Sequence, residues 1–314
     1  MSQIHKVLLV SHIKVHNANA LSSPYTIGFP AMTAFLGAVH ALQRKVQASG
    51  WKVTFAGVGV VCHSMDLQTY RGPNDYVSFI VGTSNPLNRD GSRPSFIAEA
   101  RCHLDLSLVI DMTGFDIDDE QSFCQQIGDS VSGAMKIAGG DILTFAAPEV
   151  LVLEDGNEQD LAKLNRKLMP GYALIERREL MIEAMEQGQD AVDALLDYLA
   201  IHHTCKQDDD GLVTWSSRRK VAPVKEGELP CPPGWIVPIA TGFHGITPLA
   251  TAKNQRDSDT PHRFAESVVT LGEFKMPYRL SGIKELLWHY YHDEENNLYL
   301  CQQVTEEQND LDFY

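Results

Sequence analysis

The feature that most constrains the fold is an apolar stripe over residues 32 to 46, which follows directly on a polar loop. Its members recur at three- and four-residue spacing, so they share one face of a single helix. Gly28-Phe29-Pro30 separates the loop from this helix, because the residue before a proline is forced out of helical space. Residues 4 to 15 read as a buried strand, so the chain opens as strand, loop and helix. The stripe consists of Met32, Phe35, Leu36, Val39, Leu42 and Val46.

The loop and the far face of this helix form a candidate anion site. Hydrogen-bonding side chains are dense in the loop, and the positive end of the helix dipole would lie beside them. The alternative is that they only cap local turns and that the helix carries a solvated charge. The loop donors are Asn17, Asn19, Ser22, Ser23 and Thr26. The far helix face carries Thr33, Gly37, His40 and Arg44.

Charge is distributed unevenly along the 314 residues. The formal net charge is −15, yet residues 1 to 110 hold nine Lys and Arg against five Asp and Glu. A locally basic third inside an acidic chain predicts an anion-binding face, with the acidic remainder serving solubility or a basic partner. The six scattered cysteines contain no Cys-x-x-Cys pair, and no apolar run is long enough to span a bilayer. We therefore expect a cytoplasmic protein with free thiols, no membrane association and no cofactor or metal site.

The order of elements in the first half predicts an α+β fold. Residues 53 to 62 and 76 to 81 read as strands, and residues 118 to 138 as a helix stopped by two glycines. Residues 142 to 145 and 150 to 153 look extended. This order is that of a ferredoxin-like, or RRM-like, core over residues 1 to 155.

A basic turn interrupts that core. Asn85 to Ser92 (NPLNRDGS) is a turn-forming sequence that would expose Asn88 and Arg89, and the alternating stretch from 96 to 110 containing Arg101 reads as a half-buried strand. A hairpin arm over residues 82 to 110 is expected, and an ordinary surface hairpin with Arg89 paired to Asp90 is the alternative.

The second half is expected to hold an inserted region and a return to the core. Residues 160 to 198 read as helical with a break at 169 to 172, and residues 208 to 233 as exposed loop, which gives an insertion over 156 to 232. Residues 233 to 314 would return with an edge or bulged strand at 234 to 240 and a helix at about 282 to 291. The acidic tail from Asp293 reads as partly disordered.

The common enzyme signatures are absent. No Walker loop, Gly-x-Ser-x-Gly elbow or His-Glu-x-x-His is present. Cys62-His63 and Cys102-His103 are neighbours on strands and should face opposite sides of a sheet, so they are not nucleophile and base. His202-His203, and His289 with His292, are interpreted as structural or solvated pairs on helices.

The basic and aromatic residues are compatible with single-stranded RNA as a ligand. Arginines could contact phosphates, and aromatic rings could stack on bases. Of these residues, Arg89 and Arg263 lie in segments too polar to be explained by packing, whereas Phe29, Trp235 and Phe264 are each expected in the core.

A string of motifs, in order over most of the chain, resembles one family. The motifs are Asn17-Ala-Asn-Ala-x-Ser-Ser-Pro24, Gly28-Phe-Pro30, His40-Ala-Leu-Gln-Arg44, Asn85-Pro-Leu-Asn-Arg-Asp-Gly-Ser92, Arg101-x-His-Leu104, Pro170-Gly-Tyr-Ala-Leu174, Gly234-Trp-x-Val-Pro-Ile239, and Thr260-Pro with Arg263-Phe264. They are similar to the smaller tail subunit of the type I-F CRISPR surveillance complex, also called the Csy complex.

That resemblance implies a RAMP-superfamily protein with an RRM-like core, a β-hairpin thumb and an added helical region. It implies a non-catalytic subunit that holds the 5′ handle of the guide RNA, pairs with the large tail subunit, contacts the adjacent backbone subunit and meets target DNA only through the complex. Carried onto this chain, the RNA-binding candidates are Asn17, Asn19, Ser22, Ser23, His40, Arg44, Asn88, Arg89, Arg101 and Arg263.

Two other functions remain open at this point. The first is a metal-independent guide-RNA endonuclease of the same superfamily, which needs a general base such as His40 or His63 beside a phosphate. The second is a small-molecule enzyme on a ferredoxin-like scaffold.

Overall fold

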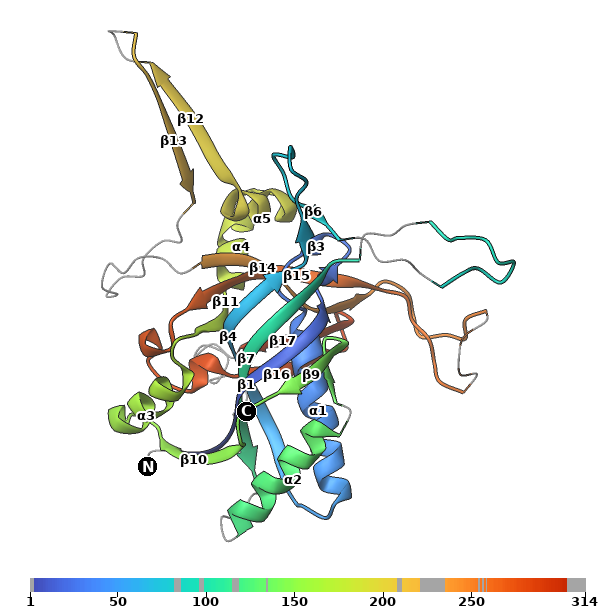
Figure 1. Cartoon of the computed structure of the whole chain (residues 1–314), viewed down its shortest axis with the longest axis vertical. Helices are drawn as coiled ribbons and strands as arrows, with labels where there is room; N and C mark the ends of the chain where they lie inside the picture. Colours follow the sequence, from blue (N-terminus) through green and yellow to red (C-terminus); the bar gives the residue numbers. More distant parts are fainter. Residues whose placement is uncertain are drawn as a thin grey trace.

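The fold is built on one large antiparallel sheet with helices on its faces (Figure 1). The computed structural model describes residues 3–81, 86–95, 99–114, 119–133, 135–207, 211–220, 235–253, 255, 257 and 259–303. Eleven strands join in the main sheet, and the described residues hold five α-helices. The predicted α+β class is thus confirmed. Among the described residues, no helix has both the length and the apolar character needed to cross a bilayer.

The central strands of the sheet come from the first half of the chain. Their order is β9–β1–β7–β4, with β10 also paired to β1. The elements are β1 (Ile4–Asn19), α1 (Met32–Ala48), β4 (Thr54–Leu67), β7 (Arg101–Thr113), α2 (Glu120–Ser132), β9 (Gly140–Thr144) and β10 (Glu149–Glu154). Short pairs complete this part: β2 (Leu21–Ser23), β3 (Thr26–Ile27), β5 (Thr69–Tyr70), β6 (Phe79–Ile80) and β8 (Lys136–Ile137).

The α1 helix covers one face of these strands because its apolar stripe is buried as predicted. Phe35 and Leu36 contact a core that includes Leu8 from β1 and Leu106 from β7. The α2 helix adds Phe123 to the same cluster. Each such side chain contributes about 1.5–3 kcal/mol on burial, so this face forms the main core.

The second half of the chain extends the sheet and curls it back on itself. The pairings β4–β16–β17–β14–β15–β11 close through β11 onto β4. The elements are α3 (Glu158–Leu168), β11 (Tyr172–Glu176), α4 (Arg178–Glu186), α5 (Ala191–Leu199), β14 (Trp235–Gly245), β15 (Ala265–Lys275), β16 (Trp288–Asp293) and β17 (Leu298–Gln303), with the 3₁₀ turns Pro277–Arg279 and Lys284–Leu286. A separate hairpin, β12 (Ile201–Gln207) with β13 (Val213–Arg219), extends away from the body (Figure 1).

The other face of the central strands is covered over only part of its length. Leu164 and Leu168 of α3, with Leu280 and Leu286, cover Val7, Leu9, Val61 and Val109. Towards the far end of β1 the side chains on this face become polar and exposed. The central sheet therefore has one fully covered face and one half-open face.

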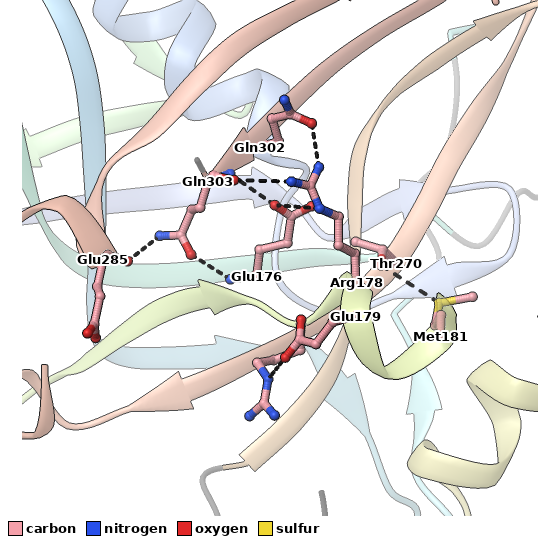
Figure 2. Close-up of polar contacts among 9 residues, drawn as sticks. Glu176, Arg178, Glu179, Met181, Thr270, Glu285, Gln302 and Gln303 are labelled. Atoms are coloured by element: carbon pink, nitrogen blue, oxygen red, sulfur yellow. Dashed lines mark hydrogen bonds and ion pairs between the residues drawn. The ribbon is translucent and has the colours of Figure 1, made fainter. Parts of the chain in front are cut away.

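A buried polar network fastens β17 to β11 (Figure 2). The Glu176 N–H donates to Gln303 Oε1 at 2.8 Å, and the Gln303 N–H donates to Glu176 Oε2 at 2.9 Å. Gln303 Nε2 donates to the Glu285 carbonyl at 2.7 Å. Arg178 donates to Gln302 Oε1 and, at 3.3 Å, to the Gln303 carbonyl. Except for the bond to Glu285, which is 18 positions from Gln303, these bonds join segments more than 120 residues apart.

Several sequence-based elements in the first half need correction. The strand expected at 76–81 is reduced to Phe79–Ile80, and Tyr76 is almost fully exposed. The helix expected at 118–138 ends at Ser132, and Lys136–Ile137 forms a strand. The helix stops because Gly133 takes non-helical dihedrals and Ala138 and Gly139 then form a turn with positive φ.

The second half departs further from expectation. The helix expected at 282–291 is a 3₁₀ turn followed by β16, so His289 and His292 lie on a strand. His202 and His203 also lie on a strand, β12. The expected helical region over 160–198 contains the strand β11, and the expected loop contains the hairpin strand β13.

The remaining differences concern the C-terminal third. Residues 265–275, for which the sequence predicted no element, form β15, and residues 298–303 of the tail form β17 rather than disordered chain. The strand expected at 234–240 forms the start of β14, where Pro238 pairs regularly with Leu271 of β15 and the described pairing to β17 begins only at Gly242. The register shift in β14 lies beyond Pro238, between Ala240 and Gly242. Residues 82–85, 96–98, 221–234 and 304–314, on which parts of the expected arm, insertion and tail fall, lie outside the described residues.

Candidate functional site

The half-open face of the sheet carries the densest group of polar side chains on regular structure. β1 contributes His12, Lys14 and His16, each exposed and separated by the buried Ile13 and Val15. The facing positions of β7 and β4 are also polar. We call this group the polar face; its further members are Asn17 and Asn19 from β1, His63, Ser64 and Asp66 from β4, Arg101, His103, Asp105 and Ser107 from β7, and Gln68.

Two β-bulges place β1 side chains on the polar face. The register between β1 and β7 shifts between Val10 and Ile13 and again between Val15 and Ala18. His12 and Asn17 lie in these bulges with positive φ, at 51° and 60°. Non-glycine residues in this region are uncommon and occur more often at functional sites. The bulges interrupt simple alternation and add Asn17 to the same exposed surface as His16.

One pair of imidazoles joins all three strands. The rings of His12 and His63 stack with centroids 4.2 Å apart. His12 Nδ1 lies 3.2 Å from Asp105 Oδ1. His63 Nε2 lies 2.6 Å from Ser107 Oγ, and its Nδ1 lies 2.6 Å from the Pro170 carbonyl oxygen. Every ring nitrogen of His63 therefore has a partner.

A second pair lies further along the same strands. His16 and His103 stack with centroids 4.4 Å apart. The Asn17 N–H donates to His103 Nδ1 at 3.2 Å, and the Gln68 side-chain amide donates to Asn17 Oδ1 at 3.3 Å. This part of the polar face therefore combines imidazole rings, whose facing sides are stacked on each other, with amide hydrogen-bonding groups.

The charges on the polar face are mixed. Lys14 is exposed and lies opposite Asp105 in the β1–β7 register. Arg101 lies opposite Asn19 and forms an ion pair with Glu99 at 2.9 Å. These two cations lie on the same face as the stacked histidines, so the surface can contact phosphate as well as base or ribose groups.

The cysteines next to these histidines face the opposite side of the sheet, as predicted, and that side is the covered face. Cys62 and Cys102 belong to the main core, while His63 and His103 point to the polar face. Burial raises the pKa of the Cys62 thiol to about 12 and that of Cys102 to about 11. Because nucleophilic cysteines need a low pKa, these thiols are unsuited to that role.

The structure divides the loop and helix candidates. Asn17 and Asn19 lie on the polar face with Arg101, although Asn19 also bonds Leu21 of its own turn. Ser22 and Ser23 both bond Thr26, which corresponds to the local-turn alternative. His40 and Arg44 are exposed on α1, which packs on the opposite face of the sheet. Arg44 also lies about 18 Å along the axis from the start of α1, at about 1.5 Å per residue.

The remaining candidates lie on loops. Asn88 bonds Ser92 across a turn, and Arg89 at its tip is exposed. Asp90 is bonded to Ser92, and the described residues give Arg89 no ion pair with it. Arg263 is half-buried beside Gly245, and its Nε has no hydrogen-bond partner in the described part of the chain.

Two of the three aromatic assignments are wrong. Phe29 is buried as expected, but Trp235 and Phe264 are 63% and 61% exposed. Conversely, the sequence did not single out His12, His16 or Gln68, and it considered His103 only as the neighbour of Cys102 and in a family motif, not as a binding residue. The alternation of polar and apolar residues in 101–107 could have indicated His103, whereas the bulges that orient His12 and Asn17 have no signal in one strand alone.

Comparison with known proteins decides the family. A family model described as CRISPR-associated protein (Cas_Csy2) matches residues 8–301. The chain belongs to the Csy2 family. CRISPR-associated protein Csy2 of Pseudomonas aeruginosa (strain UCBPP-PA14) is 35% identical to it over 308 residues, which cover 93% of this chain and 94% of the relative. Membership in the Csy2 family confirms the resemblance to a subunit of the type I-F CRISPR (Csy) complex.

Proposed function

We propose that this Csy2-family chain is a non-catalytic, RNA-binding subunit that holds the 5′ handle of the guide RNA through its polar face. The observation that supports this most strongly is the open sheet surface with two stacked histidine pairs, amides and two cations. RNA is recognised through unstacked bases, 2′-hydroxyls and phosphates, and the polar face offers a group for each of these.

An RRM-like core is part of this proposal. The strand order β9/β10–β1–β7–β4, with α1 and α2 both on one face, supports it. In such a core the face opposite the two helices binds RNA. Here α3 covers one part of that face, and the histidines lie on the part that it leaves open. Residues 1–155 would form the core, 156–232 the added region and 233–314 the return to the sheet.

The arms of the chain are proposed to act as clamps and partner contacts. The loop with Asn88 and Arg89 would form the tip of the thumb, and the expected thumb range of 82–110 has to end before β7, because Arg101–Thr113 form a central strand of the main sheet. The strands of the β12–β13 hairpin are almost entirely exposed and carry Lys206, Arg218 and Arg219, whereas the sequence between the two strands holds Asp208, Asp209 and Asp210. Charges of this kind suit RNA backbone or the acidic surface of a neighbouring subunit.

The complex supplies the remaining parts of the activity. The chain would pair with the large tail subunit and contact the adjacent backbone subunit, in the cytoplasm. Target DNA would be read by base pairing with the guide, so this chain needs no base-specific contact with DNA. The endonuclease alternative is not favoured by membership in the Csy2 family.

Removing the two cations of the polar face tests this assignment. The chain is tagged, co-expressed with its neighbouring operon products and purified with bound RNA, and guide binding is titrated against salt. Lys14→Ala with Arg101→Ala is expected to weaken guide binding about tenfold at 0.15 M salt. The slope of log K against log salt should fall by about 1.4, because two phosphate contacts are lost.

Two further variants make that result specific. Lys163→Ala with Arg166→Ala removes two exposed cations from α3 and should leave the affinity within about twofold. Arg44→Ala with Arg89→Ala tests the candidates on α1 and the thumb loop. Loss of guide binding in the latter pair but not in the polar-face pair would contradict the polar-face assignment. Cleavage of repeat RNA by the purified chain would contradict the non-catalytic role.

A further inference from the structure

Three side chains of the polar face have the composition of a metal site. His12 of β1, His63 of β4 and Asp105 of β7 each offer one possible ligand atom, and these atoms lie within 4.8 Å of one another. The residues are 42 or more positions apart, so no sequence motif predicts this group. Two imidazoles with one carboxylate form a ligand set for borderline divalent transition metals such as Zn²⁺.

The Pro170 carbonyl fixes the orientation of the His63 ring. A carbonyl oxygen only accepts hydrogen bonds, so the 2.6 Å contact with the Pro170 carbonyl requires that His63 Nδ1 carries the proton. The lone pair of the neutral ring is then on Nε2, which faces Ser107 and the cluster. A backbone carbonyl that holds the second nitrogen of a ligating histidine is the usual support of such a ligand.

The backbone around Pro170 is shaped for this contact. A Cβ atom at Gly171 would lie 2.9 Å from His63 Nδ1 and 2.8 Å from a methyl of Val61. Gly171 therefore allows β11 to approach β4 closely enough for the Pro170 carbonyl to reach the ring.

His12 and Asp105 complete the arrangement. Their closest ligand atoms, Nδ1 and Oδ1, are 3.2 Å apart. Two ligands on a tetrahedral ion with bonds of about 2.0–2.1 Å would be about 3.3 Å apart, so the separation of these two atoms suits a shared metal. His12 keeps its position through the bulge and through its N–H, which donates to Ser107 Oγ at 3.2 Å.

We propose that His12, His63 and Asp105 bind one divalent transition-metal ion, with Zn²⁺ as the fitting example. Ligands bind a metal in the deprotonated form, so a proton on His12 Nδ1 has to move to its Nε2 or to solvent. The His12 ring also has to turn out of its stack on His63, and the Ser107 hydroxyl gives up His63 Nε2, so that both lone pairs meet the ion. Three protein ligands leave a fourth position open to the polar face, where water would bind. This site does not depend on the proposed RNA binding.

Zinc titration of the full chain tests the site. Protein dialysed against chelator and then against chelator-free buffer is titrated with ZnCl₂ by calorimetry, in a Cys205→Ser background that removes the exposed thiol. We expect one saturable equivalent. His12→Gln and Asp105→Asn should each weaken it at least tenfold, by analogy with the loss of supporting groups in metal sites. The Co²⁺ complex should show visible absorption typical of four-coordinate cobalt, and that absorption should be lost in both variants.

His244→Gln is the matched control. His244 Nδ1 lies 3.1 Å from Glu266 Oε1, so it forms the same kind of exposed histidine–carboxylate pair, but it belongs to no three-ligand group in the described residues. Zinc binding in this variant should equal that of the parent. Circular dichroism melting of each variant verifies folding. The proposal would be overturned if the parent chain bound no saturable equivalent of zinc. It would also be overturned if His244→Gln lost as much zinc binding as His12→Gln, or if folded Asp105→Asn bound zinc as tightly as the parent.

Discussion

Replacing Trp288 by alanine is expected to lower the free energy of unfolding by about 4 kcal/mol. Trp288 is fully buried and is the largest of the completely buried side chains. It begins β16 and pairs with Val58, the single described position at which β16 and β4 pair. Its indole N–H donates to the Leu174 carbonyl of β11 at 2.9 Å, so the side chain holds three strands of the closed ring together.

Urea unfolding, followed by circular dichroism, measures this effect. Trp288→Phe keeps most of the apolar contacts but leaves the Leu174 carbonyl without its donor, so an intermediate loss of about 1–3 kcal/mol is expected. Trp215→Ala is the matched control, because Trp215 is 69% exposed on β13 and its removal should change stability by about 0.5 kcal/mol or less. Similar losses for Trp288→Ala and Trp215→Ala would contradict the role of Trp288 in closing the ring.

Replacing Glu176 by glutamine is expected to remove a pH dependence of about 3 kcal/mol from the stability of the chain. Burial raises the pKa of the Glu176 carboxyl from 4.5 to about 7, and the Arg178 guanidinium and the Gln303 N–H offset this only partly. Between these two pH values the folded chain holds a proton that the unfolded chain has released. The stabilising contribution is thus complete below pH 4.5 and is lost as the pH rises through 7.

Unfolding free energies at pH 4.5 and pH 8 test the direction of this effect. The difference in stability between Glu176→Gln and the parent chain should shift in favour of the variant by about 3 kcal/mol over that range. Glu183→Gln on the exposed side of α4 is the control and should show no such shift. A shift in the opposite direction would mean that Glu176 is ionised throughout, with Arg178 as the dominant influence. The network around Glu176 in Figure 2 would then contain a charged carboxylate at both pH values.

Local sequence patterns correctly predicted the helices and strands that bury their apolar residues on one face. The stripe of α1 is buried as its spacing requires, and the alternation in 101–107 corresponds to β7 with Leu104 and Leu106 in the core. Such patterns arise wherever one face of an element is buried and the other is not. They predicted the α+β class for the same reason.

Elements with long-range partners were not predictable in this way. Ile283, Leu286, Leu287 and Trp288 have helix-like spacing, yet they form a turn and the start of β16. What decides their conformation is pairing with β17 and with Val58, which lies 230 residues earlier. A short stretch of sequence does not contain the partners in these contacts, so local propensity alone favoured a helix where the folded chain forms a turn and a strand.

The candidate site shows the same division. The hydroxyls of Ser22, Ser23 and Thr26 looked like ligand donors because they are dense in sequence, but they bond one another. The polar face instead gathers residues from β1, β4 and β7, which no spacing rule joins.

The sequence by itself determined the resemblance to a type I-F CRISPR complex subunit, the helix α1 and the opposite facing of each cysteine and its neighbouring histidine, because each depends on residues close together or on ordered motifs. Only the tertiary structure decided which polar residues meet. Two bulges in β1 and the antiparallel register of three strands place His12, His63 and Asp105 at one point and His16 and His103 at another. Register is set by pairing between distant segments, and pairing is a property of the folded sheet rather than of any one strand.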